Sequence, residues 1–343
     1  MKNQMRVISL KKWFISPLPD SGSILIVTVW TLLFLSSFCV TLGYIVHAKL
    51  NTAGHIKDRV IAHYLAKAGI QAAIQVLADD RTEYDSLNDT WSNNEQFFRE
   101  IELGSGVFTV SYHAPCPMLY AQETMYGLID EERKININAA SGDILASLLI
   151  MSGCPDSTAG RLADCIIDWR DEDSEPLGRG AEDGYYNSLE ISYNCKDADF
   201  ESTEELLLVK GITDEIFSGI KHNLTVFGDG GININTAGKD VLIAAGMGAA
   251  LAEKIINYRA GIDGIEATLD DGIFEDSGEI KEKLSLSEIE EEIIDSLVSS
   301  GLIAVSSDNF RVVSRGKLNN APVSSKIICV IDREEAVKHW QQD

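Results

Sequence analysis

A run of 24 residues without a formal charge, from Ser23 to Val46, constrains this chain more than any other feature of its sequence. At about 1.5 Å of rise per residue, a helix of that length crosses a hydrocarbon core of roughly 30 Å once. Four basic residues and a single acid precede the run, and this bias predicts that the short N-terminus stays cytoplasmic. The large remainder of the chain is therefore expected on the exported side of the membrane.

The residue in front of the run raises two interpretations of this segment. Gly22 follows a basic leader and directly precedes Ser23 and the apolar stretch. One interpretation is a plain signal anchor; the other is cleavage between Gly22 and Ser23, because this arrangement resembles a type IV prepilin leader. A cleaved secretory signal is disfavoured, since the run is too long for an h-region. Most type IV pilins and pseudopilins carry Glu at the fifth mature position, which here is Val27.

The sequence predicts that the helix of the span continues beyond the membrane and is followed by strands on either side of a helical middle. No Pro occurs from His47 to Leu77, and apolar residues recur at three- or four-residue spacing, which predicts one helix over about residues 24–79. Its second half should pack on a soluble domain. Alternating residues predict a strand over 106–114 and two C-terminal strands joined as a hairpin at 319–322. The helical middle is then an insertion between strands of one sheet.

An internal repeat organises this middle. The segment Ile135–Ala140 recurs as Ile232–Ala237 at an offset of 97 residues, and each copy leads to an apolar helix that ends in Arg170 or Arg259. Asn138 and the equivalent Asn235 are expected to cap the helix that follows them. Between the copies, residues 204–224 predict a further helix, turn and helix.

These units resemble helix-hairpin-helix repeats, and the second copy also resembles the opening of competence DNA receptors of the ComEA kind. In such hairpins a Gly-x-Gly turn presents backbone N–H groups to phosphate, and only Gly246-Met247-Gly248 has that form here. From Lys134 to Arg259 there are 10 basic and 21 acidic residues, a net charge of −11, whereas nucleic-acid modules show a basic face. A protein-interaction or structural domain is favoured, no nucleic acid is expected, and a membrane-anchored DNA receptor is the alternative function.

The stretch with the densest charge follows the first repeat. Seven of the sixteen residues from 168 to 183 are carboxylates, and only two arginines accompany them. A closed loop of this composition would repel itself without a cation, and oxygen ligands suit calcium. Pro176 occupies the place where an EF-hand needs Gly, so a non-EF calcium loop and a solvated acidic loop stay open. The candidate ligands are Asp168, Asp171, Asp173, Glu175, Glu182 and Asp183.

Composition excludes several functional classes. The formal net charge is −24, and loss of residues 1–22, with four basic residues and one acid, would take it to −27. Such a chain is a poor polyanion binder. No HExxH, GxSxG or Walker-type sequence occurs, so no enzymatic activity is predicted. Of six cysteines, Cys39 lies in the span and the five others outside it form no CxxC pair, which leaves their connectivity open.

Taken together, the acidic tract DWRDEDSEP, the following GAEDGYY, the paired NIN units and the Gly-preceded span resemble the K-type minor pseudopilins of the type II secretion system (the GspK family) over about residues 22–335. The resemblance implies an α+β fold: a long N-terminal transmembrane helix continues into a pilin-like α/β domain with a large all-α insertion of helix-hairpin-helix or SAM-like type. It also implies bound calcium. The expected location is the inner membrane, with one span and a periplasmic soluble domain.

The resemblance further implies a position and partners. In the family, Glu at the fifth position is understood to pair with the N-terminal amine of the subunit ahead, so Val27 marks a subunit that needs none, at the pseudopilus tip. Such a subunit primes assembly and supports secretion across the outer membrane. Expected partners are the I- and J-type minor pseudopilins, the major pseudopilin and the prepilin peptidase. The predicted segments are a leader (1–22), a span (23–46), a first pilin-like part (47–125), the insertion with its acidic loop (126–300) and C-terminal strands (301–343).

Overall fold

A computed structural model describes residues 21–116 and 121–343 of the chain. Residues 1–20, which make up most of the predicted leader, lie outside the described residues. The chain divides into two units, one that ends at Asp58 and one from Arg59 to Asp343, and each is described by itself.

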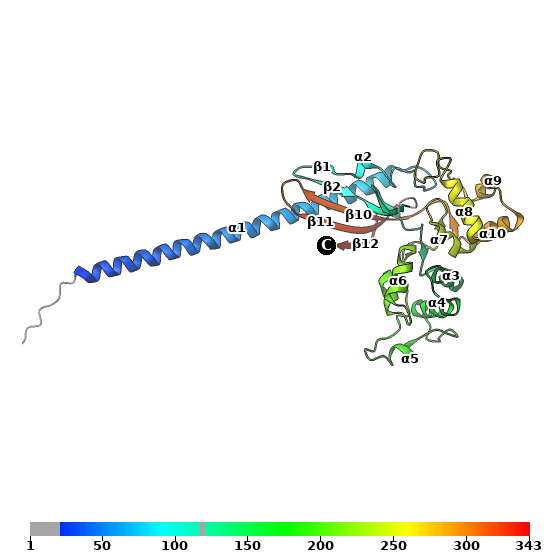
Figure 1. The fold of residues 1–343 in the computed structure, drawn as a ribbon, viewed down its shortest axis with the longest axis horizontal. Helices are drawn as coiled ribbons and strands as arrows, with labels where there is room; N and C mark the ends of the chain where they lie inside the picture. The colour runs from blue at the N-terminus through cyan, green and yellow to red at the C-terminus, as the bar shows by residue number, and fades with distance from the viewer. Residues whose placement is uncertain (1–20, 117–120) are drawn as a thin grey trace, which may run out of the picture. The chain divides into compact units, whose positions relative to one another are not determined.

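Helix α1 is continuous from Ser21–Asp79, which confirms the long N-terminal helix predicted from the sequence (Figure 1). In the first unit its side chains from Ser23 onward are almost all exposed, including large apolar ones such as Trp30 and Phe34. By length and composition this helix can cross a membrane. The segment Lys239–Arg259 passes the same test, but it is partly buried and contributes to the core of the insertion.

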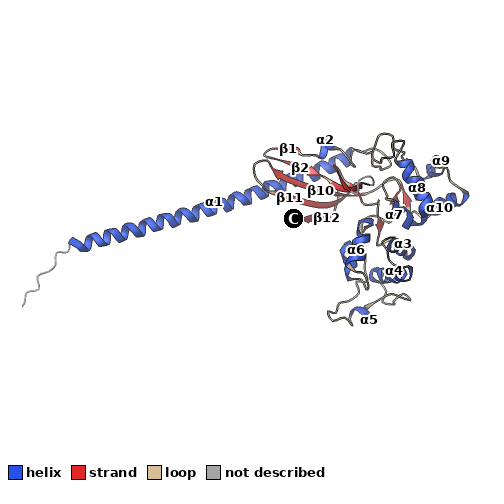
Figure 2. Ribbon diagram, in the orientation of Figure 1, coloured by secondary structure: helices blue, strands red, loops and turns tan. Residues whose placement is uncertain are grey.

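An antiparallel sheet forms the pilin-like part of the second unit (Figure 2). Its strands run in the order β1-β2-β10-β11-β12, and β5 pairs with the start of β10. The hairpin predicted at the C-terminus is confirmed as β10 and β11, whereas β12 was not predicted from the sequence. The strand bounds are β1 Ile101–Leu103, β2 Gly106–Val110, β5 Ile129–Asp130, β10 Asn309–Leu318, β11 Ser324–Asp332 and β12 Val337–Gln342; helix α2 (Glu95–Phe98) precedes β1.

The part of α1 beyond residue 59 covers one face of this sheet. Ala66, Ile70 and Ala73 pack with apolar residues of β2, β10 and β11 in one buried cluster. The helix lies so close to β10 that a Cβ on Gly316 would fall 2.1 Å from the Ala62 carbonyl oxygen. Alternate residues of a strand face opposite sides, so this contact assigns the even-numbered residues of β10 to the helix and the odd-numbered ones to the opposite face.

The prediction of one strand over residues 106–114 is wrong. Strand β2 ends at Val110, and the chain continues as β3 (Tyr112–Cys116), which pairs with β4 (Ala121–Met125) in a separate two-stranded sheet. The cause is competition for a partner strand: β2 pairs with residues 314–318 of β10, while β5 pairs with Phe310 and Arg311. Since β5 occupies the next part of β10, the chain leaves the main sheet after Ser111.

The inserted part is mostly helical and contains two short parallel strand pairs. Strand β6 (Ile135–Asn136) pairs with β7 (Leu224–Thr225), and β8 (Ile232–Asn233) pairs with β9 (Ile303–Ala304). The helix, turn and helix predicted over 204–224 are present, but the first helix, Thr203–Leu208, is of the 3₁₀ type and only the second, Asp214–Ile220, is an α-helix. The longer helices are α3 Gly142–Met151, α4 Asp156–Arg170, α6 Asp214–Ile220, α8 Gly248–Arg259 and α10 Glu288–Ser299; the shorter ones are α5 Asp183–Tyr186, α7 Lys239–Leu242 and α9 Ile280–Lys283.

The asparagines of the repeat do not cap helices, contrary to the sequence-based expectation. Asn138 instead closes a pair of hydrogen bonds with the backbone of Phe200: its Nδ2 donates to the carbonyl at 3.0 Å and its Oδ1 accepts from the N–H at 2.8 Å. Asn235 does the same with Phe274 at 2.9 Å each. Each asparagine therefore holds a distant segment against its own copy of the repeat. Because its side chain makes these two hydrogen bonds, it does not cap the helix that follows.

Arginine completes the framework of each copy. The guanidinium of Arg170 donates to the carbonyls of Ile137 and Ala140, and that of Arg259 donates to the equivalent Ile234 and Ala237 carbonyls. These carbonyls have no partner in regular secondary structure, and buried carbonyls without one are destabilising. An arginine occurs at the end of the helix in both copies because each copy has the same two carbonyl groups that need hydrogen-bond donors.

Candidate metal centre

The acidic tract predicted from the sequence begins at the last turn of α4 and is organised around Asp168. This side chain is fully buried, and its two oxygens accept hydrogen bonds from the backbone N–H groups of Leu177 and Ala181, at 3.0 and 2.6 Å. Burial raises the pKa of Asp168, and the two N–H donors oppose that shift. A Cβ on Gly180 would lie 1.7 Å from Asp168 Oδ2, so only glycine allows the loop to close here.

The segment after the loop is tied back by a second carboxylate. Asp183 Oδ1 accepts a hydrogen bond from the backbone N–H of Cys195 at 2.8 Å. The Cys195 thiol in turn donates to the carbonyl of Asp168 at 3.5 Å. Residues 195–197 are therefore held beside the acidic loop, although they follow it at some distance in the sequence.

Three of the predicted carboxylates come together. One oxygen each of Asp171, Asp173 and Glu182 lies within 4.8 Å of the others. Glu182 is only 5% exposed, and neither of its oxygens has a hydrogen-bond partner among the described residues. Burial first, and then the neighbouring carboxylates of Asp168 and Asp197, raise the pKa of Glu182 to about 7.

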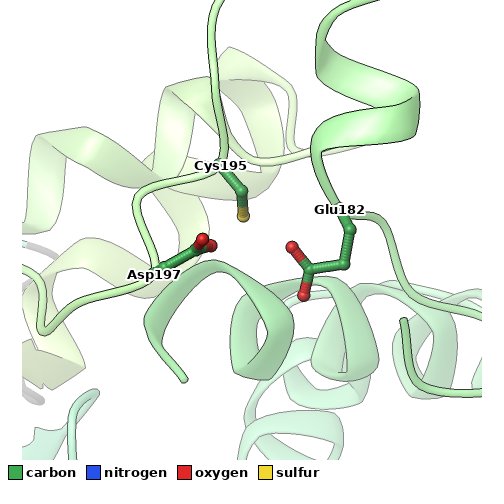
Figure 3. Close-up of side chains that lie close together, drawn as sticks. All are labelled: Glu182, Cys195 and Asp197. Carbon is green, nitrogen blue, oxygen red and sulfur yellow. The ribbon is translucent and has the colours of Figure 1, made fainter. Parts of the chain in front are cut away.

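Glu182 also belongs to a second group, with Cys195 and Asp197 (Figure 3). Figure 3 shows the two carboxylates on either side of the Cys195 thiol, with all three side chains directed toward a common space. Their ligand atoms lie within 4.8 Å of one another, and Asp197 Oδ1 is buried without a partner among the described residues. Asp197 adopts a left-handed φ of 50° to reach this position.

The donor set fits a divalent cation with a preference for oxygen. Buried carboxylates that lack donors are strongly destabilising, and a bound cation would remove that cost. Arginines do not perform this task here: Arg170 is bonded to carbonyls of the repeat framework, and Arg179 pairs with Asp164. Oxygen-rich sites of several carboxylates are typical of calcium.

The structure places the six predicted ligands in different roles. Asp171, Asp173 and Glu182 form the group, whereas Asp168 and Asp183 bind backbone N–H groups and shape the loop. Glu175 is exposed, and its own N–H donates to Asp173. Cys195 and Asp197 were not predicted, because a single cysteine and an aspartate more than a dozen residues past the tract carry no local signal. Metal ligation by the six residues stays a prediction.

A third acidic group lies outside this loop and already has a cation. Asp80, Asp85 and Asp89 lie together near the end of α1. Arg333 forms ion pairs with Asp80, at 3.1 Å, and with Asp85. Because the protein supplies its own positive charge here, this group resembles an ordinary ion-pair network more than a metal centre.

The fold and the loop together define a pilin-like protein with a membrane-type N-terminal helix and an α-helical insertion. Residues 125–229 match the family model described as type II secretion system (T2SS), protein K. A chain of the crystal structure of the GspK-GspI-GspJ complex from enterotoxigenic Escherichia coli matches with a TM-score of 0.64 and 17% identity, and the match covers 86% of this chain and 99% of that one. No curated protein sequence gives a significant match.

The family match covers the first copy of the repeat and the whole acidic loop, which are the most specific parts of the sequence. The match to the solved complex shows the same fold over nearly the full length of the solved chain. The resemblance recognised from the sequence is confirmed for residues 125–229, which match protein K of the type II secretion system, and the chain shares the fold of the solved chain.

Proposed function

We propose that the chain occupies the tip of the type II secretion pseudopilus, where it primes assembly with the I- and J-type minor pseudopilins and supports protein secretion across the outer membrane. The observation that carries the proposal is the shared fold with a chain of a solved GspK-GspI-GspJ complex, in which the three minor pseudopilins associate. The role is structural: the chain contributes binding surfaces rather than chemistry.

Val27 supports the position at the tip. It lies on α1 within the uncharged run and is 58% exposed. A carboxylate at this depth in lipid is unfavourable unless it is partnered. A subunit inside the fibre can offer its Glu to the amine of the subunit ahead, whereas a subunit at the tip has no such neighbour. An apolar residue at this position suits the tip, with the major pseudopilin added below.

Assembly and position need separate experiments. Complex formation is tested by mixing the detergent-solubilised chain with purified I- and J-type pseudopilins and measuring the mass by light scattering; we expect a complex that contains all three.

Position is tested by Val27→Glu in secreting cells, with Val29→Glu as a control for the cost of a carboxylate in the span. The tip position predicts that Val27→Glu is neutral or harmful to secretion. Improved incorporation along the fibre would contradict it.

Maturation and topology belong to the same proposal. We infer that prepilin peptidase cleaves between Gly22 and Ser23 and that the soluble domain lies in the periplasm, with the inner membrane crossed once by α1. N-terminal sequencing of the membrane-extracted chain should begin at Ser23. A start at Met1 would indicate a plain signal anchor.

Calcium is the ion that we propose for the acidic loop. Asp171, Asp173 and Glu182 would hold it, with Asp197 within reach through the group that it shares with Glu182. When bound, the ion would supply positive charge to a buried carboxylate that no protein group neutralises. The ion therefore has a structural role, in that it closes the loop and stabilises the first copy of the repeat.

A further inference from the structure

Basic residues gather in one part of this strongly acidic chain. A cleft of about 670 Å³ lies where the start of β10 meets the insertion, and five of its lining residues are Lys or Arg while two are acidic. The whole chain has 53 acids for 29 basic residues, so this local excess reverses the overall balance. The basic lining residues are Arg133, Lys134, Lys221, Lys239 and Arg311.

The charge of the cleft is only partly balanced from within the protein: Lys239 pairs with Glu253, and Glu204 and Asp240 also line the cleft. Lys134 and Arg311 share one buried carboxylate, Glu131, at 2.8 and 2.6 Å. Burial alone would raise the pKa of Glu131, but these two cations lower it to about 2, so the group carries two positive charges and one negative charge. Within the described residues, Arg133 and Lys221 have no carboxylate within 4 Å. The cleft therefore keeps a net positive charge at neutral pH.

The basic surface continues along the sheet. Arg311, Arg315 and Lys317 alternate with residues that face α1, so they lie together on the opposite face of β10. Lys326 of β11 stands directly opposite Arg315 in the register. Among the described residues, the one ion pair of Lys326 is with the exposed Asp343, at 3.9 Å. We call the cleft and this row of β10 and β11 residues the basic strip.

Two features of the basic strip indicate that it receives a partner. Like charges directly opposite each other on neighbouring strands are destabilising, so the Arg315–Lys326 pair carries a cost that a bound anion would remove. Arg315 and Lys317 are exposed and have no ion pair within the described residues, in a chain with an excess of carboxylates. From Arg311 to Lys317 the row extends about 20 Å at roughly 3.3 Å per residue.

We propose that the basic strip is a docking site for an extended acidic segment of a partner protein, with part of the segment seated in the cleft. A flat anionic bilayer could not enter a concave site and would meet the repulsion of a chain with an excess of acids. Duplex DNA is longer than the strip and would meet the repulsion of a chain with net charge −24. A short acidic segment confined to the strip avoids both penalties. The docking site does not depend on the tip position, and its test is a binding measurement.

The test is fluorescence anisotropy of a labelled oligoglutamate peptide with the full chain in neutral detergent. We expect saturable binding that weakens as salt is added, because the contacts are ionic. Arg315→Glu with Lys317→Glu should weaken binding by about tenfold or more, since attraction becomes repulsion at two contacts. Arg133→Glu with Lys221→Glu should do the same in the cleft. The matched control is Arg81→Glu with Arg161→Glu, which makes the same change in net charge at exposed positions elsewhere.

The outcomes separate the possible occupants. Absence of oligoglutamate binding, or equal loss in the Arg81 and Arg161 control, would overturn the proposal. Tighter binding of duplex DNA or of vesicles with anionic lipid, lost in the same variants, would assign the strip to those ligands instead. If the cleft variant melts at a lower temperature than the wild type, the Arg315 and Lys317 variant decides alone, because both of its side chains are exposed on the sheet.

Discussion

The two copies of the repeat share a framework and differ in the loop that follows it. In both, an asparagine binds a distant phenylalanine backbone and an arginine satisfies two carbonyls. After Arg259 the carboxylates have partners in the protein: Glu266 forms an ion pair with Arg259 at 2.5 Å, without the geometry of a hydrogen bond, and Asp270 accepts the N–H groups of Ile262 and Asp263. After Arg170, Glu182 is buried and has no partner among the described residues.

This difference shows how one scaffold supports two kinds of loop. Where the arginine is buried and paired with an acid of its own loop, the loop closes on protein contacts alone. In the first copy the arginine binds carbonyl groups and pairs with no acid. The acids that follow it therefore need positive charge from a bound cation. The comparison therefore predicts that the second copy is sensitive to loss of its arginine, whereas the first is sensitive to loss of a cation.

The largest expected effect is at Arg259. The substitution Arg259→Met leaves the carbonyls of Ile234 and Ala237 unsatisfied and Glu266 without its partner in a site where the arginine is 3% exposed. Removal of one member of a buried ion pair costs about 3–5 kcal/mol, and the lower end applies here because the Glu266 side chain is 32% exposed. Arg170→Met removes two hydrogen bonds at a partly exposed site and should cost about 1–3 kcal/mol. Thermal unfolding of the detergent-solubilised chain, followed by circular dichroism, measures both.

The control for this pair is Arg161→Met, at an exposed position of α4, which should leave the midpoint nearly unchanged. Equal losses at Arg170 and Arg259 would show that Glu266 adds nothing. The proposed distinction between the two loops would then lose its basis.

The next effect is that of calcium on the first copy. An ion that binds only the folded state stabilises by about 2.7 kcal/mol at a hundredfold excess over its dissociation constant. The melting midpoint of the chain should therefore be higher with calcium than with chelator. Glu182→Gln should abolish most of this shift, because it removes the buried charge that the ion neutralises. Glu266→Gln, the matched change in the second copy, should lower the midpoint but preserve the calcium shift.

Two results would count against the metal centre. Identical midpoints with calcium and with chelator would leave only a solvated acidic loop. A calcium shift that survives Glu182→Gln would place the ion elsewhere in the chain.

Local patterns in the sequence predicted the parts of the fold that depend on local contacts. The long helix followed from unbroken apolar spacing, the C-terminal hairpin from alternation around a turn, and the repeat from identical spacing in both copies. The exit of the chain after Ser111 could not be predicted, because it depends on β5, a two-residue strand that competes for β10. The roles of Asn138 and Asn235 could not be predicted either, because asparagine suits both a helix cap and a long-range contact with a backbone.

The candidate site was predictable to a similar degree. The density of carboxylates located the loop, because such a density is unusual in any closed structure. Which acids face inward depended on Gly180 and on the return of residues 195–197, and neither signal is visible along the sequence. For that reason the sequence could not show that Asp168 and Asp183 accept backbone N–H groups, or that Asp197 lies beside Glu182.

The second copy should also respond to pH, since its opening joins the sheet through buried acids. Asn233 Nδ2 donates to Asp130 and to Ser307, and its backbone N–H binds the carbonyl of Glu132. Burial, with the nearby Asp130, raises the pKa of Glu132 from 4.5 to about 8. A raised carboxyl pKa stabilises the fold below pH 4.5 and loses that contribution as the pH rises toward 8. We expect a loss on the order of 2 kcal/mol between pH 5 and pH 8.

Unfolding at a series of pH values checks this, with chelator present so that metal binding does not contribute. Glu132→Gln should flatten the profile, and Glu201→Gln, an exposed glutamate of the first copy's connecting segment, should not. A profile that is unchanged by Glu132→Gln would assign the slope to other groups.

The smallest effect comes from exchanging the helix caps of the two copies. Ser141 and Gly238 are equivalent at the repeat offset; Ser141 caps α3 by accepting from Ile144 N–H, whereas Gly238 caps α7 without a side chain. Gly238 has φ −73° and ψ 160°, like Ser141, and open space where a Cβ would lie. Gly238→Ser should therefore stabilise the chain by about 0.5–1 kcal/mol, from the cap and from a less flexible unfolded state.

Ser141→Gly should destabilise it by a similar amount, and the double exchange should return the melting midpoint to that of the wild type. A destabilised Gly238→Ser variant would mean that the second copy needs glycine for a contact that its backbone angles do not reveal, and that the two frameworks are less alike than their hydrogen bonds indicate.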